Sequence, residues 1–171
     1  MAKYAAFLRG VNVGGVNLKM AEVAAALTDA GFTAVRTILA SGNVVLESSS
    51  GVSAVRKKAE AALRDRFGYD AWVLAYTNDT VRAIDDAYPF EREVDGFQSY
   101  VTFVTDPTVL DELAALAAGP KEKIARGEGV IYWQVPKGST LDSTIGKTMG
   151  TRRYKSSTTT RNLRTLAKVL R

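Results

Sequence analysis

The chain has 171 residues, of which 46% are hydrophobic and 24% are charged. This length and composition are typical of a soluble globular protein, and they exclude a largely disordered chain, a collagen-like chain and a disulfide scaffold. The sequence contains no cysteine and no histidine. It therefore cannot hold a cysteine nucleophile, a Ser-His-Asp triad, a zinc site of thiolates or imidazoles, or a disulfide that would imply an oxidising compartment.

The net charge of +5 is distributed unevenly along the chain. Residues 1–120 carry 11 Lys and Arg against 15 Asp and Glu, a balance of −4, whereas residues 121–171 carry 12 against 3, a balance of +9. The basic C-terminal third would face an acidic ligand or the other half of the molecule. A solvated basic surface is the alternative explanation.

Neither a signal peptide nor a membrane span is expected. The apolar run from Tyr4 to Leu8 stops at Arg9, which makes it too short for the hydrophobic region of a signal peptide. No stretch of the sequence approaches the roughly 20 apolar residues of a spanning helix. We therefore expect a cytoplasmic protein.

The first half of the chain predicts the order β-α-β-β-α-β. An apolar strand at residues 3–9 is followed by a glycine-rich loop and then by a helix. In this helix apolar residues recur at helical spacing from Met20 onward, and Gly31 marks its end. The following elements are strands at 33–39 and 43–48, a helix at about 52–67 that Gly68 ends, and a strand at 70–76. This order is that of the ferredoxin-like split βαβ fold.

The second half nearly repeats this order after a short helix near residues 79–87. It predicts a strand at 98–104, a helix from Asp106-Pro107 to about 117, strands at about 121–126 and 129–135 around Gly127-Glu128-Gly129, and helices near 141–149 and 160–170. The result is β-α-β-β-α-α, one strand short of the first half. We predict an α+β fold with a duplicated ferredoxin-like architecture, antiparallel or mixed sheets, and domains at residues 1–95 and 96–171. A single mixed sheet is the alternative.

The strongest local signal for binding is the glycine-rich loop after the first strand. Its glycines permit positive φ and a close approach of a ligand to the main chain, while the following helix directs its N–H groups and positive end at the same spot. The loop lacks both the closing Gly-Lys-Ser/Thr of a P-loop and the G-x-G-x-x-G spacing. An anion site is predicted at Arg9, Gly10, Asn12, Gly14, Gly15, Asn17 and Lys19. The structural alternative is that the glycines only satisfy an awkward turn.

The second candidate segment is Ser41-Gly42-Asn43. All three residue types favour turns, so a hairpin alone would explain them. The segment and the glycine-rich loop nevertheless both lie at strand ends of one predicted sheet. We therefore expect the two segments to border one cleft.

The third candidate segment is Thr158-Thr159-Thr160-Arg161-Asn162. A threonine before a periodic apolar set predicts a helix N-cap, and on that helix the cations at 161, 164, 168 and 171 would form one basic stripe. This predicts Arg161 and Asn162 as further ligand-binding residues. A solvated helix face is the alternative explanation.

Six short segments, spread from residue 4 to about 170, follow one another along the chain in the order expected of a known family. They are Phe7-Leu8-Arg9-Gly10-Val11-Asn12-Val13-Gly14-Gly15, Lys19-Met20, Ser41-Gly42-Asn43-Val44-Val45, Ile131-Tyr132-Trp133, Pro136-Lys137-Gly138 and Thr159-Thr160-Arg161-Asn162. Together they resemble the bacterial family named domain of unknown function 1697. Two departures are Leu163, where an aromatic residue commonly follows Arg-Asn, and the segment 139–147, a loose version of a Ser-Lys-Leu region. The resemblance implies a compact two-part α+β protein and implies no activity.

The sequence thus predicts a protein that binds a phosphorylated or carboxylated small molecule, such as a nucleotide, through the glycine-rich loop. We expect charge from Arg9, Lys19 and Arg161, and orientation from Asn12, Asn43 and Asn162. Whether a reaction is catalysed stays open, as do catalytic residues, cofactor and oligomeric state, and no metal site is predicted. The alternatives are a weak nucleic-acid-binding module that uses the basic C-terminal third, and a structural or protein-interaction domain without a ligand.

Overall fold

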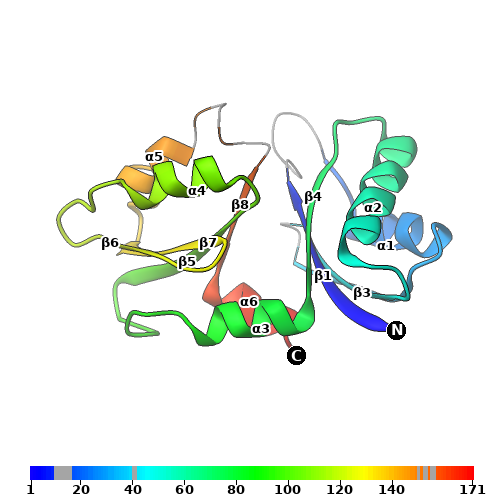
Figure 1. The fold of residues 1–171 in the computed structure, drawn as a ribbon, viewed down its shortest axis with the longest axis horizontal. Coiled ribbons are helices and arrows are strands. Elements are labelled where there is room, and N and C mark those ends of the chain that lie inside the picture. Colours follow the sequence, from blue (N-terminus) through cyan, green and yellow to red (C-terminus); the bar gives the residue numbers. More distant parts are fainter. Residues whose placement is uncertain (10–16, 40–41, 150, 152–153, 155–156) are drawn as a thin grey trace. The chain divides into compact units, whose positions relative to one another are not determined.

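The computed structural model describes residues 1–9, 17–39, 42–149, 151, 154 and 157–171. These residues form two compact units, one of Met1–Arg82 with Ala167–Arg171 and one of Ala83–Leu166. Each unit contains a four-stranded antiparallel sheet with helices packed on it (Figure 1). The predicted α+β class is confirmed. The domain boundary at residues 95/96 stays a prediction, which limited proteolysis can test.

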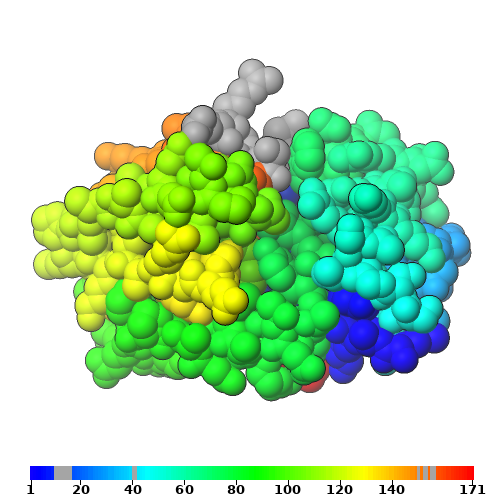
Figure 2. Space-filling model, in the orientation of Figure 1, coloured from blue at the N-terminus to red at the C-terminus, as the bar shows by residue number. Residues whose placement is uncertain are grey.

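The first unit has the order of elements that the sequence predicts. In chain order these are β1 (Ala2–Arg9), α1 (Met20–Asp29), β2 (Thr33–Ile38), β3 (Asn43–Ser48), α2 (Val52–Phe67) and β4 (Trp72–Thr77). The strands lie in the order β2-β3-β1-β4, and each neighbouring pair is antiparallel. Figure 2 shows the solvent-facing side of α2, coloured cyan to teal.

Alternation along β1 directs one set of side chains toward α1 and α2. Tyr4, Ala6 and Leu8 lie in a buried cluster with Leu27 of α1 and Leu63 of α2, among other residues. Successive strand residues point to opposite faces of a sheet, so every second residue of β1 reaches the helices. This packing fixes the end of β1, and with it Arg9, relative to the start of α1.

Glycine ends α2 at the residue that the sequence indicates. Gly68 adopts φ +64°, in the left-handed region, and its N–H donates to the carbonyl of Arg64 at 2.9 Å. A glycine adopts this conformation without the steric penalty that a side chain would bring. The chain can therefore leave the helix and turn back into β4.

α2 also covers the outer edge of β4. The buried carboxylate of Glu60 accepts a hydrogen bond from the N–H of Val73 at 2.9 Å, and the guanidinium of Arg64 donates to the carbonyl of Ala71 at 2.8 and 3.1 Å. These side chains satisfy backbone groups that an edge strand would otherwise leave open to another strand. These contacts hold α2 against the start of β4.

The second unit contains a sheet with the same relative strand order. Its elements are β5 (Phe97–Val104), α4 (Pro107–Ala114), β6 (Lys123–Arg126), β7 (Val130–Pro136), α5 (Thr144–Met149) and β8 (Thr158–Asn162), preceded by α3 (Asn78–Asp86) and followed by α6 (Leu163–Val169). The strands lie in the order β6-β7-β5-β8, all antiparallel. In both sheets the first strand of the unit therefore lies between the third and the fourth.

The prediction of a helix over residues 160–170 is wrong at its start. Residues 158–162 form β8, which pairs with β5 from Val104 opposite Thr158 to Tyr100 opposite Asn162. Threonine is β-branched and favours strands, and the hydroxyl of Thr160 lies 2.8 Å from that of Thr102 across the pair. The second half therefore has the fourth strand that the sequence pattern did not indicate.

α4 and α5 lie together on one face of the second sheet (Figure 1). Trp133 is fully buried between strand and helices, its ring stacks on that of Tyr100 at a centroid distance of 4.5 Å, and its indole N–H donates to Thr102 Oγ1 at 2.9 Å. The buried indole thus keeps a partner for its polar atom. In the part of the chain that the structure describes, no helix has the length and apolar character needed to span a membrane.

Candidate functional site

Arg9 is the last residue of β1 and lies opposite Trp72 of β4. It is half-buried, and this burial lowers the pKa of its guanidinium because desolvation disfavours the charged form. An arginine keeps its proton at neutral pH in spite of such a shift. A partly desolvated cation gains more from an anion than a fully hydrated one does, because its field is less screened.

Asn17 and Lys19 lie just before α1, and both are exposed. Lys19 is the N-cap of the helix and has an extended backbone, with φ −81° and ψ 127°. The side chain of Lys19 forms no capping hydrogen bond, and the N–H groups of Glu22 and Val23 both donate to the carbonyl of Lys19, at 3.0 and 3.1 Å. The positive end of this ten-residue helix is thus left to the backbone, to solvent or to a ligand. The predicted residues Gly10, Asn12, Gly14 and Gly15 lie outside the described residues.

Gly42 and Asn43 lie at the start of β3, and they have structural contacts. Gly42 has φ +90°, which favours glycine, and its carbonyl accepts from the N–H of Leu8 at 2.8 Å. Asn43 is fully buried, and its Nδ2 donates to the carbonyl of Ile38 at 2.9 Å. The amide therefore ties the start of β3 to the end of β2. Ser41 lies outside the described residues.

The described flanks of the two predicted segments lie at the same end of the first sheet. β1 and β3 are antiparallel neighbours, and Phe7 is opposite Asn43, so the end of β1 at Arg9 is next to the start of β3. This agrees with the expectation that both segments belong to one end of one sheet. A cleft between them would be formed by residues 10–16 and 40–41, which are not described, and it stays a prediction.

Arg161 and Asn162 belong to β8, in the other compact unit. Arg161 is only 8% exposed, and its Nη1 donates to Thr159 Oγ1 at 2.6 Å and to the carbonyl of Thr160 at 2.8 Å. Asn162 caps α6, because its Oδ1 accepts from the N–H of Thr165 at 2.8 Å. Each side chain thus has a local structural contact. Their assignment to ligand binding stays a prediction.

The predicted basic stripe does not form on one helix. Arg161 lies on a strand and is buried, whereas Arg164 lies on α6 and forms an ion pair with Glu93 at 3.7 Å. The sequence pattern failed because the residues at 161 and 164 belong to different elements, so their spacing of three does not place them on one helical face.

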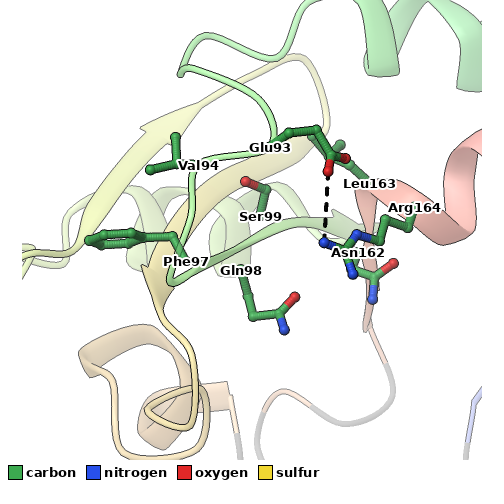
Figure 3. A pocket seen from close by; sticks show the side chains of 8 residues that line it. All are labelled: Glu93, Val94, Phe97, Gln98, Ser99, Asn162, Leu163 and Arg164. Carbon is green, nitrogen blue, oxygen red and sulfur yellow. Dashed lines mark ion pairs between the residues drawn. The ribbon is translucent and has the colours of Figure 1, made fainter.

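The structure adds a pocket that the sequence does not reveal. It lies where β5 begins and β8 passes into α6, and it is a shallow hollow whose cavity volume is only about 20 Å³ (Figure 3). Its lining combines a carboxylate, a guanidinium, amides, a hydroxyl and apolar side chains, from Glu93, Val94, Phe97, Gln98, Ser99, Asn162, Leu163 and Arg164. Asn162 is the one predicted site residue in this lining. The others could not be found because β8 was expected to be helical.

A buried amide contacts one residue of this lining and the chain just before it. Gln134 on β7 is 3% exposed, and its Nε2 donates to the carbonyl of Glu91 at 2.9 Å and to Ser99 Oγ at 3.1 Å. The hydroxyl of Tyr88 lies 3.4 Å from the same nitrogen, and burial raises the pKa of this phenol, so it stays protonated at neutral pH. The chain before β5 is thereby fixed to the sheet.

Within the described residues, no group of three or more Asp and Glu side chains could hold a metal ion. The described groups offer arginine, carboxylate and amide side chains together with backbone N–H groups.

Comparison with known proteins places the sequence in a family. Residues 1–132 match the family described as protein of unknown function (DUF1697). The chain belongs to this family. The resemblance inferred from the sequence motifs is thereby confirmed. The matched part of this DUF1697 protein contains Arg9, the start of α1 and the segment from Glu93 to Ser99, and β8 and α6 lie beyond it.

The fold of this DUF1697 protein is similar to that of a solved structure. The conserved bacterial protein SP0830 from Streptococcus pneumoniae aligns with a TM-score of 0.81 and 22% sequence identity, over 98% of this chain and 96% of that chain. At this identity the similarity shows a shared fold alone. No curated protein matches the sequence.

Proposed function

We propose that the protein binds a small phosphorylated or carboxylated molecule, such as a nucleotide. The proposed site is where β1 passes through the glycine-rich loop into α1. One observation carries the proposal: the N-cap of α1 is a lysine whose side chain forms no capping hydrogen bond, and the strand that precedes the helix ends in a half-buried arginine. Helix N-termini of this kind bind phosphate and carboxylate groups through backbone N–H groups.

The charges around the start of α1 support an anion rather than a cation as ligand. Arg9 and Lys19 flank the loop, and Glu22 is the one acidic residue in the first turn of the helix. Because Arg9 is partly buried, solvent screens its charge less than it screens the charge of the exposed Lys19. Lys19 should therefore contribute less to the binding of an anion. Arg9 should therefore supply most of the ionic part of the affinity.

Isothermal titration calorimetry with inorganic phosphate, adenosine monophosphate and citrate tests the proposal. Arg9→Gln should weaken binding by about 10- to 100-fold, because a hydrogen bond to a charged group contributes about 1.5–3 kcal/mol. Arg66→Gln is the control, since Arg66 is an exposed arginine on α2 in the same unit. Absence of binding by all three probes, or equal loss in both variants, would contradict the proposal.

Nucleic-acid binding through the basic C-terminal third remains the alternative function. The burial of Arg161 and the ion pair of Arg164 leave fewer cations for phosphate contacts than the sequence suggests. We therefore expect only weak, sequence-independent binding that disappears near about 150 mM salt. Sub-micromolar binding in a gel-shift titration at that salt concentration would favour the alternative.

We further infer that both units have the ferredoxin-like topology and that the chain is a duplication of it. The support is that each sheet has its strands in the same relative order, with two crossover helices in each unit on one face. A cytoplasmic location also stays a proposal, which cell fractionation can test.

A further inference from the structure

Trp72, the first residue of β4, lies next to Arg9 at one end of the first sheet. The two residues are directly opposite each other in the antiparallel pairing of β1 and β4. Directly opposite residues of such a pair direct their side chains to the same face of the sheet, with Cβ atoms about 5 Å apart. The indole of Trp72 therefore begins beside the side chain on which the proposed anion site depends.

A second arginine covers one side of the indole. Arg64 of α2 places its guanidinium carbon over the ring of Trp72, 5.4 Å from the ring centre. Its Nε and Nη2 both donate to the carbonyl of Ala71, at 3.1 and 2.8 Å. This double contact fixes the guanidinium in place. The cation–π interaction in turn holds the ring of Trp72.

Trp72 remains partly exposed beside these two arginines. Its neighbours along the chain, Ala71 and Val73, are fully buried and pack into the core of the first unit, whereas Trp72 between them keeps accessible surface. The other tryptophan of the chain, Trp133, is 1% exposed and serves the core of the second unit. Accessible aromatic rings next to arginines are surfaces on which nucleic-acid bases stack.

We propose that the ligand of the anion site is a nucleotide whose phosphate binds near Arg9 and whose base stacks on Trp72. This inference rests on the proposed function and adds the base to it. A single sugar separates the phosphate from the base of a nucleoside monophosphate, so two adjacent side chains can contact both parts. A phosphorylated sugar or a carboxylic acid without an aromatic ring would leave the indole without a partner.

Arg64 determines how the base can bind. Its guanidinium occupies one side of the indole, so the base contacts the other side. Because Arg64 already holds the ring, the base does not have to order it, and less conformational entropy is lost on binding. Stacking of one base on an aromatic side chain should then strengthen binding by about 5- to 100-fold.

Titrations with three matched probes test the proposal. Adenosine monophosphate carries the base and the phosphate, ribose 5-phosphate lacks the base, and adenosine lacks the phosphate. In a Trp133→Phe background, where Trp72 alone fluoresces, adenosine monophosphate should change the emission in a saturable way and ribose 5-phosphate should not. In calorimetry, adenosine monophosphate should bind at least about fivefold more tightly than ribose 5-phosphate.

Variants at Trp72 show whether the indole causes this preference. In Trp72→Leu the affinities for adenosine monophosphate and ribose 5-phosphate should become equal, because leucine is apolar but has no aromatic face. Trp72→Phe should retain part of the preference. Arg66→Gln is the control and should keep the whole preference, because Arg66 is an exposed arginine of the same helix that pairs with Asp29.

The outcomes separate this inference from the proposed function. Equal affinities of the wild type for adenosine monophosphate and ribose 5-phosphate would overturn the stacking and leave the anion site intact. A preference that persists in Trp72→Leu, or loss of both ligands in that variant, would also overturn the stacking. Binding of adenosine that Trp72→Leu abolishes, without binding of ribose 5-phosphate, would overturn the anion site alone. No binding of any probe would overturn both.

Discussion

Replacement of Asn43 by alanine should destabilise the first unit in the absence of any ligand. The side chain is fully buried, and its Nδ2 donates to the carbonyl of Ile38. Ile38 is itself only 7% exposed. Alanine removes the donor, so the carbonyl of Ile38 loses this hydrogen bond in a place that water does not reach. A buried polar group that loses its partner costs about 1–3 kcal/mol, and this is the expected decrease in the free energy of unfolding.

Urea unfolding monitored by tryptophan fluorescence measures this decrease. The chain has two tryptophans, so in a Trp133→Phe background Trp72 alone reports, and it lies in the first unit. Asn17→Ala is the matched control, because Asn17 is exposed and its replacement should change stability by no more than about 0.5 kcal/mol. If Asn43→Ala proves as mild as Asn17→Ala, the structural role of the buried amide is refuted, and ligand binding becomes its better explanation.

Three further perturbations have defined outcomes. Asn162→Ala should cost about 1 kcal/mol in thermal unfolding because α6 loses its N-cap, whereas Asn162→Asp should keep most of that stability; equal loss in both would contradict the cap. Glu60→Ala should lower the free energy of unfolding in urea by about 1–3 kcal/mol, because the N–H of Val73 loses its acceptor. Glu60→Gln should keep much of that stability. An unfolding free energy of Glu60→Ala equal to that of the wild type would show that water replaces the carboxylate. Burial raises the pKa of Tyr76 to about 12, with a smaller opposing effect of Arg56; since the native phenol then keeps its proton longer than the unfolded one, stability should fall as the pH rises from about 10 to about 12. Tyr76→Phe should lack that part of the fall, and an identical pH profile would contradict the raised pKa.

The first sheet could be predicted because each of its elements has a local signal. Gly31 and Gly68 both adopt positive φ, as the sequence pattern requires for residues that follow a helix. Alternating or continuous apolar residues mark the strands, and the order of elements restricts the topology to few choices. In the second half, Asp106 caps α4 as expected, with its Oδ1 accepting from the N–H of Thr108 at 2.9 Å.

β8 could not be predicted because its stability comes from residues far away in the sequence. Thr160 contacts Thr102 across the sheet, and such a pairing leaves no trace in the local pattern of residues 158–162. The local pattern instead favours a helix, since the apolar residues from Leu163 onward are spaced for one. The pocket between β5 and α6 was missed for the same reason, because Glu93 and Arg164 meet only when β8 is a strand.

The candidate anion site could be predicted as a segment of the chain, but the role of each residue could not. Burial separates the predicted residues: Asn43 and Arg161 are buried and hydrogen-bonded to the main chain, whereas Asn17 and Lys19 are exposed. Asparagine and arginine serve equally well as internal clamps and as ligand contacts, and sequence alone does not distinguish the two uses.

A crystal structure of the protein with adenosine monophosphate tests the central claim most directly. The proposed function predicts that the phosphate lies at the N-terminal end of α1, within hydrogen-bond distance of backbone N–H groups of the loop or first turn and of the guanidinium of Arg9. A phosphate bound elsewhere, or no bound nucleotide in crystals soaked well above the dissociation constant measured by calorimetry, would contradict it.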